Sequence, residues 1–387
     1  MKYKDVLASL MLIGLAAGVS VSQDKTYTIE YIDGVKHIHN HTPLWGDEPK
    51  VKIEFVREYG EEESVDDNYN MYIISDMCSD KEGNLYFVDN GNTRIQVFDA
   101  HGKYLRTIGR EGQGPGEFMI PVFVDIDDDG ILYVFDIERN GAIHKFAKDG
   151  RFIERLQMKF HMGDVYGIRL IDDDYIVFNT KQMDIPFDRP PGYGEMTPHV
   201  KIYDTDGKFI REFCEPAILN THWDTKAYSD IFLAVDKDKN AVMSFLFQNR
   251  VEKYSLNGDI LFTMTRNLNY NVEKPEYILG TTHFKTAPTL VSNGIAVDHK
   301  GRFWVCTYTR QPENDGTKSR ENLRARYTES RTTEGMCVFE IFSSDGILLG
   351  KLPYDGSMVL IRIIGDRLFI WNSGAVVVSE YRIVDLE

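Results

Sequence analysis

Two aspartates, Asp89 and Asp136, are the first residues of this sequence whose types and spacing suggest a polar site. Each ends an apolar run and is followed by amide or guanidinium groups, Asn92 and Arg94 after the first and Arg139 after the second. Carboxylate, amide and guanidinium groups together can hold a polar ligand or a cation. The alternative is that these groups brace neighbouring structural units through hydrogen bonds. Both interpretations stay open at this point.

A basic segment, residues 310–335, stands out in an otherwise acidic chain. Its arginines include Arg310, Arg324 and Arg326. Guanidinium groups bind carboxylates and phosphates through paired hydrogen bonds, so these three residues are ligand-binding candidates. The alternative is a solvated flap without a ligand.

Two patterns suggest metal ions. His37, His39 and His41 alternate, so on a strand they project to one side, where zinc or copper could bind. Residues 125–130 together with Asp136 have the spacing of a calcium loop. Other copies of the same turn carry different numbers of acidic residues, which favours turn chemistry over calcium. We therefore predict no cofactor, with calcium or zinc as the alternatives.

The four cysteines are too few for a disulfide scaffold in 387 residues. Cys306 and Cys337 flank the basic segment and are predicted on neighbouring strands. They form either a disulfide bridge, as an oxidising compartment allows, or two buried free thiols.

No motif of a known catalytic type is present. Residues 109–116 are rich in glycine but lack the Lys-Ser/Thr ending of a phosphate loop, and no helical pattern follows them. There is also no Gly-x-Ser-x-Gly elbow. We predict no catalytic residue.

The elements that must position these residues are short antiparallel strands. One hairpin pattern, an alternating strand, a glycine turn and a second strand, recurs five times. The five copies are residues 95–108, 143–156, 200–213, 251–264 and 339–352. The turn glycine supplies the positive φ that a tight hairpin needs.

A second hairpin precedes each copy, so each unit has four strands. The preceding hairpins are residues 76–89, 124–136, 168–180, 233–245 and 295–307. Four-stranded units repeated in this way predict a β-propeller, an all-β fold. Residues 360–386 supply three strands of a sixth unit, and residues 51–60 resemble its missing outer strand. We therefore predict six blades, with the ring closed by the N-terminal strand.

Residues 89–127, DNGNTRIQVFDAHGKYLRTIGREGQGPGEFMIPVFVDID, resemble an NHL repeat, including the glycine-rich stretch before a proline. The chain is also similar to exported six-bladed propeller proteins of Bacteroidetes. The resemblance implies the fold and leaves the activity open, because propellers have many functions.

The two faces of the predicted propeller are unequal. With the strands of a blade named a to d from the axis outward, the a–b and c–d turns share one face. The b–c and d–a connections share the other face, which also receives every long insertion and which we call the loop-rich face. The insertions are residues 181–198, 214–229, 265–290 and 308–335. Long loops on a rigid scaffold commonly form binding sites.

The N-terminus predicts export. Residues 1–22 combine two lysines, an apolar run and small residues, as in a signal peptide. Val19 stands where a lipoprotein would have cysteine, and no second long apolar run predicts a transmembrane segment. We expect a soluble periplasmic or extracellular protein with an extension at 23–50 and the propeller at 51–387.

The formal charge of −16 argues against nucleic acid as a partner. The leading hypothesis is a module that binds a small molecule, glycan, peptide or protein on the loop-rich face. The alternative is a metal-dependent hydrolase or lyase with an ion at the central channel, similar to lactonase-like or amidating-lyase-like propellers. A second alternative is an interaction scaffold in a multiprotein assembly.

Overall fold

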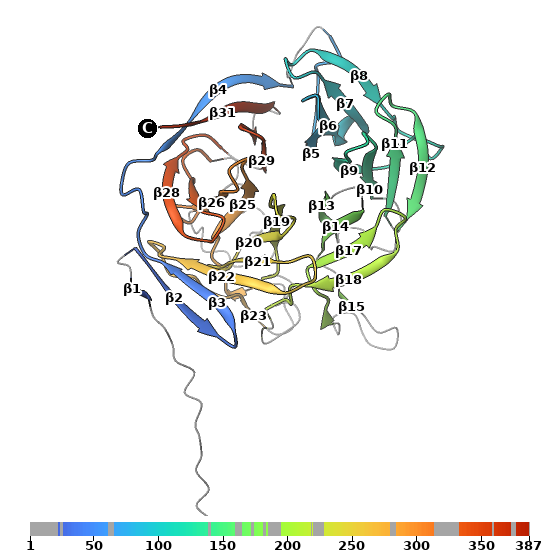
Figure 1. Cartoon of the computed structure of the whole chain (residues 1–387). Helices are drawn as coiled ribbons and strands as arrows, with labels where there is room; N and C mark the ends of the chain where they lie inside the picture. The colour runs from blue at the N-terminus through green and yellow to red at the C-terminus, as the bar shows by residue number, and fades with distance from the viewer. Residues whose placement is uncertain are drawn as a thin grey trace, which may run out of the picture.

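The chain folds into six four-stranded antiparallel sheets arranged around a central axis (Figure 1). The fold is a six-bladed β-propeller, as predicted. The computed structural model describes residues 22–23, 26–60, 66–137, 141–158, 165–171, 174–180, 183–184, 195–217, 219, 228–278, 284–312, 333–357, 360–372 and 377–386.

Each blade is a meander whose first strand lies innermost. Blade 1 contains β5 (Ile74–Ser79), β6 (Leu85–Asp89), β7 (Arg94–Phe98) and β8 (Tyr104–Ile108). Blade 2 contains β9 (Pro121–Ile126), β10 (Leu132–Asp136), β11 (Ala142–Phe146) and β12 (Phe152–Gln157). Blade 3 contains β13 (Val165–Ile171), β14 (Tyr175–Thr180), β17 (Val200–Asp204) and β18 (Phe209–Phe213).

The second half of the ring repeats this order. Blade 4 contains β19 (Ile231–Val235), β20 (Ala241–Phe245), β21 (Val251–Tyr254) and β22 (Ile260–Arg266). Blade 5 contains β25 (Ser292–Val297), β26 (Phe303–Tyr308), β27 (Cys337–Phe342) and β28 (Leu348–Pro353). Blade 6 contains β29 (Leu360–Ile364), β30 (Arg367–Asn372), β31 (Val377–Asp385) and β4 (Val51–Tyr59).

The ring closes between the two ends of the chain. Strand β4 pairs antiparallel with β31 along its whole length, from Val51 opposite Asp385 to Tyr59 opposite Val378. This pairing satisfies the backbone groups that an open three-stranded blade would expose at its edge. The prediction that the N-terminal strand completes the last blade is confirmed.

The segment before β4, unplaced by the sequence, extends blade 4. Strands β2 (Tyr27–Ile32) and β3 (Val35–Asn40) form a hairpin, and β3 pairs in parallel with β22 (Figure 1). The short β1 (Ser22–Gln23) pairs with β2. The chain then follows blade 5, where the backbone N–H groups of Leu44 and Trp45 donate to the carbonyls of Leu348 and Leu349. Residues 26–59 thus connect the outer edges of blades 4, 5 and 6.

Tight turns join the strands on one face. All five glycines of the recurring c–d hairpin have positive φ, between 82° and 92°. Many turns of this face also contain an aspartate, whose carboxylate accepts backbone N–H groups two and four residues later. Asp80, Asp236 and Asp298 do so in blades 1, 4 and 5. This is the local hydrogen bonding that makes aspartate a common turn residue.

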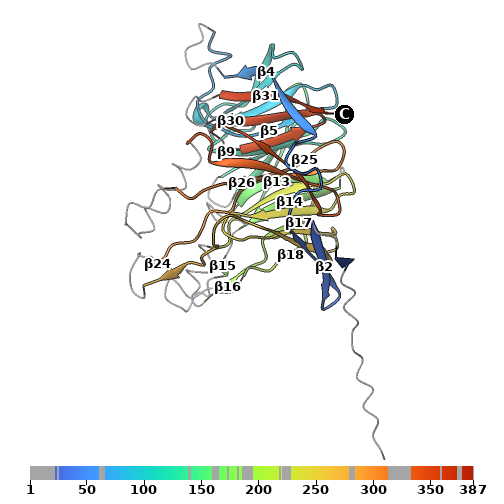
Figure 2. The same cartoon turned by 90° about the vertical axis from the view of Figure 1, so that its left-hand side faces the viewer.

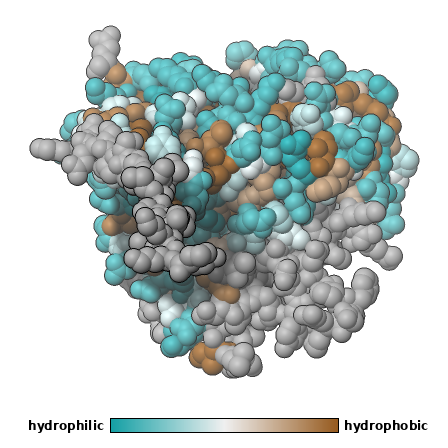
Figure 3. Space-filling model, turned by 60° about the horizontal axis from the view of Figure 1, so that its bottom comes forward, coloured by the Kyte–Doolittle hydropathy of each residue, from teal (hydrophilic) through white to brown (hydrophobic). Residues whose placement is uncertain are grey.

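The insertions lie on the opposite face. Figure 2 shows β15 (Met183–Asp184), β16 (Glu195–Met196) and β24 (Phe284–Thr286) on one side of the disc. Strand β24 pairs with β23 (Glu276–Tyr277) in the connection between blades 4 and 5. In the view of Figure 3, the described surface is mainly hydrophilic, with small hydrophobic areas between.

Helix is nearly absent from the described residues, whose single helix is the 3-10 turn η1 (Asn90–Asn92). No helix in this part of the chain is long and apolar enough to cross a membrane.

Candidate functional site

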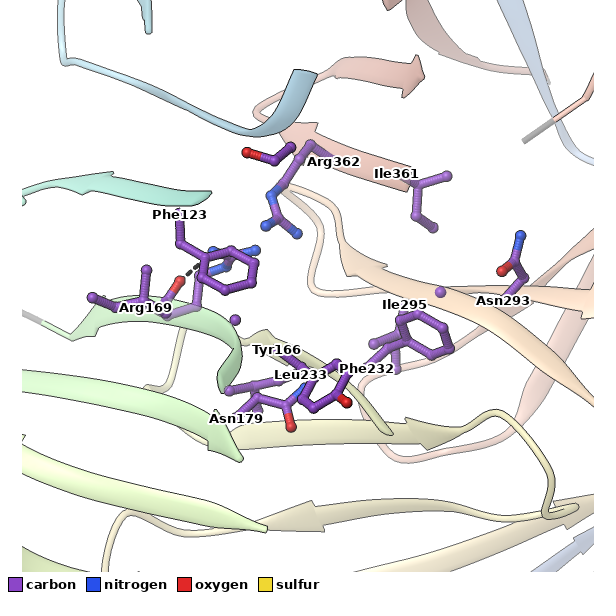
Figure 4. A pocket seen from close by; sticks show the side chains of 14 residues that line it. Phe123, Tyr166, Arg169, Asn179, Phe232, Leu233, Asn293, Ile295, Ile361 and Arg362 are labelled. Atoms are coloured by element: carbon purple, nitrogen blue, oxygen red, sulfur yellow. Dashed lines mark hydrogen bonds between the residues drawn. The ribbon is translucent and has the colours of Figure 1, made fainter. Parts of the chain in front are cut away.

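A cavity of about 50 Å³ lies on the axis of the propeller, and all six innermost strands contribute to its wall (Figure 4). Arg169 and Arg362 supply its charge, while Asn179 and Asn293 supply amide groups. Several apolar side chains, among them Phe232, complete the wall. The cavity is therefore partly polar and partly apolar, as small-molecule sites usually are.

The cavity lies toward the loop-rich face. Each inner strand begins at a d–a connection on that face, and the cavity takes residues from the early part of every strand. Ser75 is the second residue of β5, Asn293 the second of β25 and Arg362 the third of β29. Arg169 is the lining residue that lies furthest along its inner strand, as the fifth of seven residues in β13.

Asp76 joins the two arginines of the cavity. Its carboxylate forms ion pairs with Arg362 and, at 3.4 Å, with Arg169. The carboxylate is fully buried, whereas the two guanidinium side chains are 16% and 17% exposed. Blades 6, 1 and 3 are thus connected across the channel by one acidic group, because Arg362, Asp76 and Arg169 come from different inner strands.

Asp125 on β9, which is half-buried, is a second carboxylate near Arg169. Its Oδ2 accepts a hydrogen bond from the backbone N–H of Leu170 at 2.8 Å. Burial raises the pKa of the Asp125 carboxyl to about 6, although the charge of Arg169 and the backbone hydrogen bonds act in the opposite direction. Burial also raises the pKa of Asp76, partly offset by Arg169.

Several polar atoms of the cavity lack a partner within the described part of the chain. Asn179 donates to the carbonyl of Ile231 at 2.8 Å, and its Oδ1 accepts no hydrogen bond there. Nε of Arg362 is buried without a hydrogen bond to any described residue. A buried polar group without a partner costs free energy, so a ligand that satisfied these atoms would be stabilised.

The sequence-predicted cluster around Asp89 forms, but away from the cavity. The buried carboxylate accepts hydrogen bonds from the backbone of Tyr72, from Asn92 and from Arg94, at 2.9, 2.9 and 2.8 Å. Arg94 also donates to the carbonyl of Asn70 at 2.6 Å. The contacts with Tyr72 and Asn70 hold the segment that leads into β5, so the cluster braces its own blade, and none of these contacts reaches a neighbouring blade.

Asp136 has the equivalent position in blade 2. Its buried carboxylate accepts the backbone N–H groups of Met119 and Ile120, both at 2.6 Å, just before β9. Arg139 lies outside the described residues. In the turn at 125–130, Asp127 accepts the N–H groups of Asp129 and Ile131, so the calcium-like spacing produces an aspartate turn.

Of the predicted arginines in the basic segment, only Arg310 is described. It is exposed, two residues beyond the end of β26. Arg324 and Arg326 lie outside the described residues.

The three histidines lie on and just after β3, as the alternation predicted. Both ring nitrogens of His39 are hydrogen-bonded, to Thr265 and to Glu30 at 2.9 Å each. His41 Nε2 lies 3.3 Å from the hydroxyl of Thr28. Among the described residues, no three His, Cys, Asp or Glu side chains converge on a metal position. The geometry of His37, His39 and His41 therefore lends zinc no support.

Cys306 and Cys337 lie on neighbouring strands, as predicted, but they are free and buried. Cys306 stands opposite Phe339 and Cys337 opposite Tyr308, so the two cysteines are diagonal neighbours. Diagonal positions place Cβ atoms about 7 Å apart, more than a disulfide bridges. The structure thus has free thiols in place of the disulfide alternative.

The cavity residues themselves were not predicted from the sequence. The signal that marks them is a charged residue within an apolar inner strand, as in ISDMCS, VYGIRLI and LIRII. Arg169 and Arg362 also share one slot, two residues before the end of their strands. Burying such a charge is costly, so it indicates a partner across the channel.

Comparison with known proteins agrees with this architecture. The family model DUF5128, described as a 6-bladed beta-propeller, matches residues 66–222. The match is to a propeller family. Its description does not mention NHL repeats, so that assignment stays a prediction. A search of curated proteins found no match.

Two solved structures share the fold at low sequence identity. A member of the DUF4221 family from Bacteroides vulgatus is 12% identical, with a TM-score of 0.59, and the similarity covers 87% of this chain and 99% of that one. A Bacteroides fragilis protein described as exported is 10% identical, with a TM-score of 0.55, over 91% of this chain and 100% of its own. At these identities the likeness concerns the fold alone.

Proposed function

We propose that this protein is an exported propeller that binds a small ligand in the axial cavity, at the loop-rich end of its channel, without catalysing a reaction. The observation that carries the proposal is the cavity itself, which all six inner strands build and which presents polar atoms without partners. A rigid ring of strands holds such a site in one geometry, which lowers the entropic cost of binding.

The chemistry of the lining supports binding. The titratable lining residues are Arg169, Arg362 and Tyr166, and the remaining polar ones are Ser75, Asn179 and Asn293. The hydroxyl of Ser75 already donates to the carbonyl of Val122 at 2.7 Å. Arginine and asparagine side chains recognise a ligand by directed hydrogen bonds and need no proton transfer to do so.

Export is part of the proposal and is supported by the composition of residues 1–22. Mass spectrometry of the mature protein from the cell envelope fraction tests it. Removal of the N-terminal segment is expected, and a full-length chain in the cytoplasmic fraction would contradict it.

The binding function is tested by thermal shift against a panel of acidic, neutral and basic small molecules, followed by isothermal titration. The cavity variant is Asp76→Asn with Arg362→Gln, which removes both members of one ion pair and leaves Arg169 beside the charge of Asp125. The control, Arg155→Gln, changes an exposed arginine on the outer strand β12.

We expect at least one panel compound to raise the melting temperature of the wild type and of the control. The cavity variant should lose this response while keeping its circular dichroism spectrum. A response equal in all three proteins would place binding elsewhere.

A further inference from the structure

We infer that the axial cavity binds a carboxylate group that carries a short apolar segment. The inference rests on the proposed binding function and names the ligand class.

The first support is the number of free donors on the two arginines. A guanidinium has five N–H donors in a planar fork. Arg362 uses Nη2 for Asp76, and Arg169 uses Nη1 for Asp76 and for the carbonyl of Ile168. Nε and Nη1 of Arg362 and Nε and Nη2 of Arg169 have no partner among the described residues. Nε and Nη2 of Arg169 form one edge of the fork, so a planar, two-oxygen acceptor can pair with that edge, and Nη1 of Arg362 is a further donor.

The second support is the charge around the cavity. Among the described residues, Asp76 is the carboxylate that pairs with the two guanidinium groups, so two positive charges share one paired acceptor. Asp125 lies near Arg169 but turns its carboxylate to backbone N–H groups. Strands β19 and β25, with the sequences IFLAV and SNGIAV, bring no titratable side chain. At pH 7 the charges of Asp76 and Asp125 offset those of the two arginines, so an anion is held by the guanidinium N–H groups that have no partner among the described residues, and the attraction grows as the two carboxyls take up protons.

The third support is the opposite wall and the size of the space. Phe232 and Ile295 lie across the cavity from Arg362, and Ile361 lies beside Arg362 on the same strand (Figure 4). Its volume of about 50 Å³ gives room for about four water-sized positions. A carboxylate attached to one or two further carbon atoms fits this space. The apolar wall favours carbon over further hydroxyl groups.

The acid can be a free short-chain carboxylate or the carboxyl end of a larger ligand. The test therefore uses propionate, a tetrapeptide that ends in valine, and the amides of both as neutral matches. Inorganic phosphate is a further arm, because it carries negative charge without an apolar segment. Binding is measured by isothermal titration at pH 7.0 and pH 5.5, with wild type, Arg362→Lys and the Asp76→Asn, Arg362→Gln double variant.

We expect at least one acid to bind tenfold or more tightly than its amide and more tightly than phosphate. Arg362→Lys should weaken the binding of this acid about tenfold, because lysine keeps the positive charge but lacks the planar guanidinium group. The affinity should increase at pH 5.5, where Asp76 and Asp125 begin to take up protons and the attraction from the arginines grows. Binding of the peptide acid alone would identify a chain end as the source, and binding of propionate a free acid.

Amides that bind as tightly as the acids, or phosphate that binds more tightly, would overturn the carboxylate inference and leave the binding function in place. If the acids and amides bind equally to the wild type and to the double variant, the axial cavity is not the site. If none of the acids, amides or phosphate binds, and no compound of the small-molecule panel raises the melting temperature, both proposals are wrong.

Discussion

Single buried carboxylates have two different roles in this protein. Asp89 and Asp136 accept several hydrogen bonds from backbone or side-chain donors of their own blade. Asp76 instead pairs with arginines across the channel, and Asp125 accepts backbone donors beside them. The aspartates of the blades therefore divide between bracing a blade and shaping the surroundings of the cavity, according to which donors surround them.

The raised pKa of Asp125 predicts a specific dependence of stability on pH. Its folded-state pKa of about 6 exceeds the unfolded value of about 3.9, so the folded state favours the neutral carboxyl. The contribution of Asp125 to the free energy of unfolding is largest below pH about 4. As the pH rises from about 4 through about 6, this contribution falls by about 3 kcal/mol in total.

Asp125→Asn, which stays neutral, should therefore gain about 2–3 kcal/mol relative to the wild type between pH 4 and pH 7, measured by urea denaturation. The control Asp129→Asn removes an exposed carboxylate from the same hairpin. A difference between wild type and Asp125→Asn that is constant over this pH range would contradict the prediction.

Asp89→Ala should lower the free energy of unfolding by about 3–5 kcal/mol, because it leaves buried donors, including the Arg94 guanidinium, without their acceptor. Ligand affinity at the axial cavity should stay unchanged, since Asp89 does not line it. Asp99→Ala, which removes the partly exposed aspartate of a c–d turn, should cost about 1 kcal/mol. A selective loss of ligand binding in Asp89→Ala would show that this residue belongs to a site.

At the scale of elements, the hairpin β2–β3 extends blade 4 beyond its own four strands. Ile38 of β3 is fully buried and packs in one cluster with Phe262 of β22 and Phe342 of β27. Asn40, at the end of β3, donates to the carbonyls of Thr265 and Gly346 and accepts the N–H of Leu348. The hairpin therefore fastens blade 4 to blade 5, on the outside of the ring.

Asn40→Ala should destabilise the protein by about 2–4 kcal/mol, because one buried side chain satisfies three backbone groups of two blades. Chemical denaturation measures this loss. Asn257→Ala is the matched control, since Asn257 is exposed and its side chain forms a hydrogen bond only with Arg211 among the described residues. A loss of stability as small as that of the control would mean that Asn40 does not hold blades 4 and 5 together.

At the scale of the whole molecule, stability depends on closing the ring. Tyr59 at the end of β4 lies between blades 6 and 1, where it packs against Phe87, Phe98 and Phe369. Its hydroxyl donates to Glu380 at 2.7 Å, and burial raises the pKa of that hydroxyl well above its ordinary value. One residue of the N-terminal strand thus joins the first and the last blade.

Tyr59→Ala should cost about 3–5 kcal/mol and increase protease cleavage, because it opens a large cavity at the closure. Tyr59→Phe, which keeps the ring and loses the hydrogen bond, should cost about 1–2 kcal/mol. Phe55→Ala on the same strand is the control, since Phe55 is 59% exposed. Denaturation and limited proteolysis measure all three, and equal losses for Tyr59→Ala and Phe55→Ala would contradict the role of Tyr59.

The blades, their number and the closure of the ring could all be predicted from the amino-acid sequence. Hairpins with alternating residues and glycine turns depend on local conformation, so they are visible as a repeated pattern. The same local pattern predicted the positions of Asp89, Asn92 and Arg94 at the end of a strand, although it left their role open.

The position of the cavity and the residues that form it depend on contacts between segments that are far apart in the sequence. Asp76 and Arg362 are separated by 286 positions, yet they form an ion pair because ring closure places β5 beside β29. Each inner strand contributes only a few residues to the channel wall, so no single segment carries a motif for the site. The position of the hairpin β2–β3 was likewise decided by a pairing partner more than 200 residues away along the chain, β22.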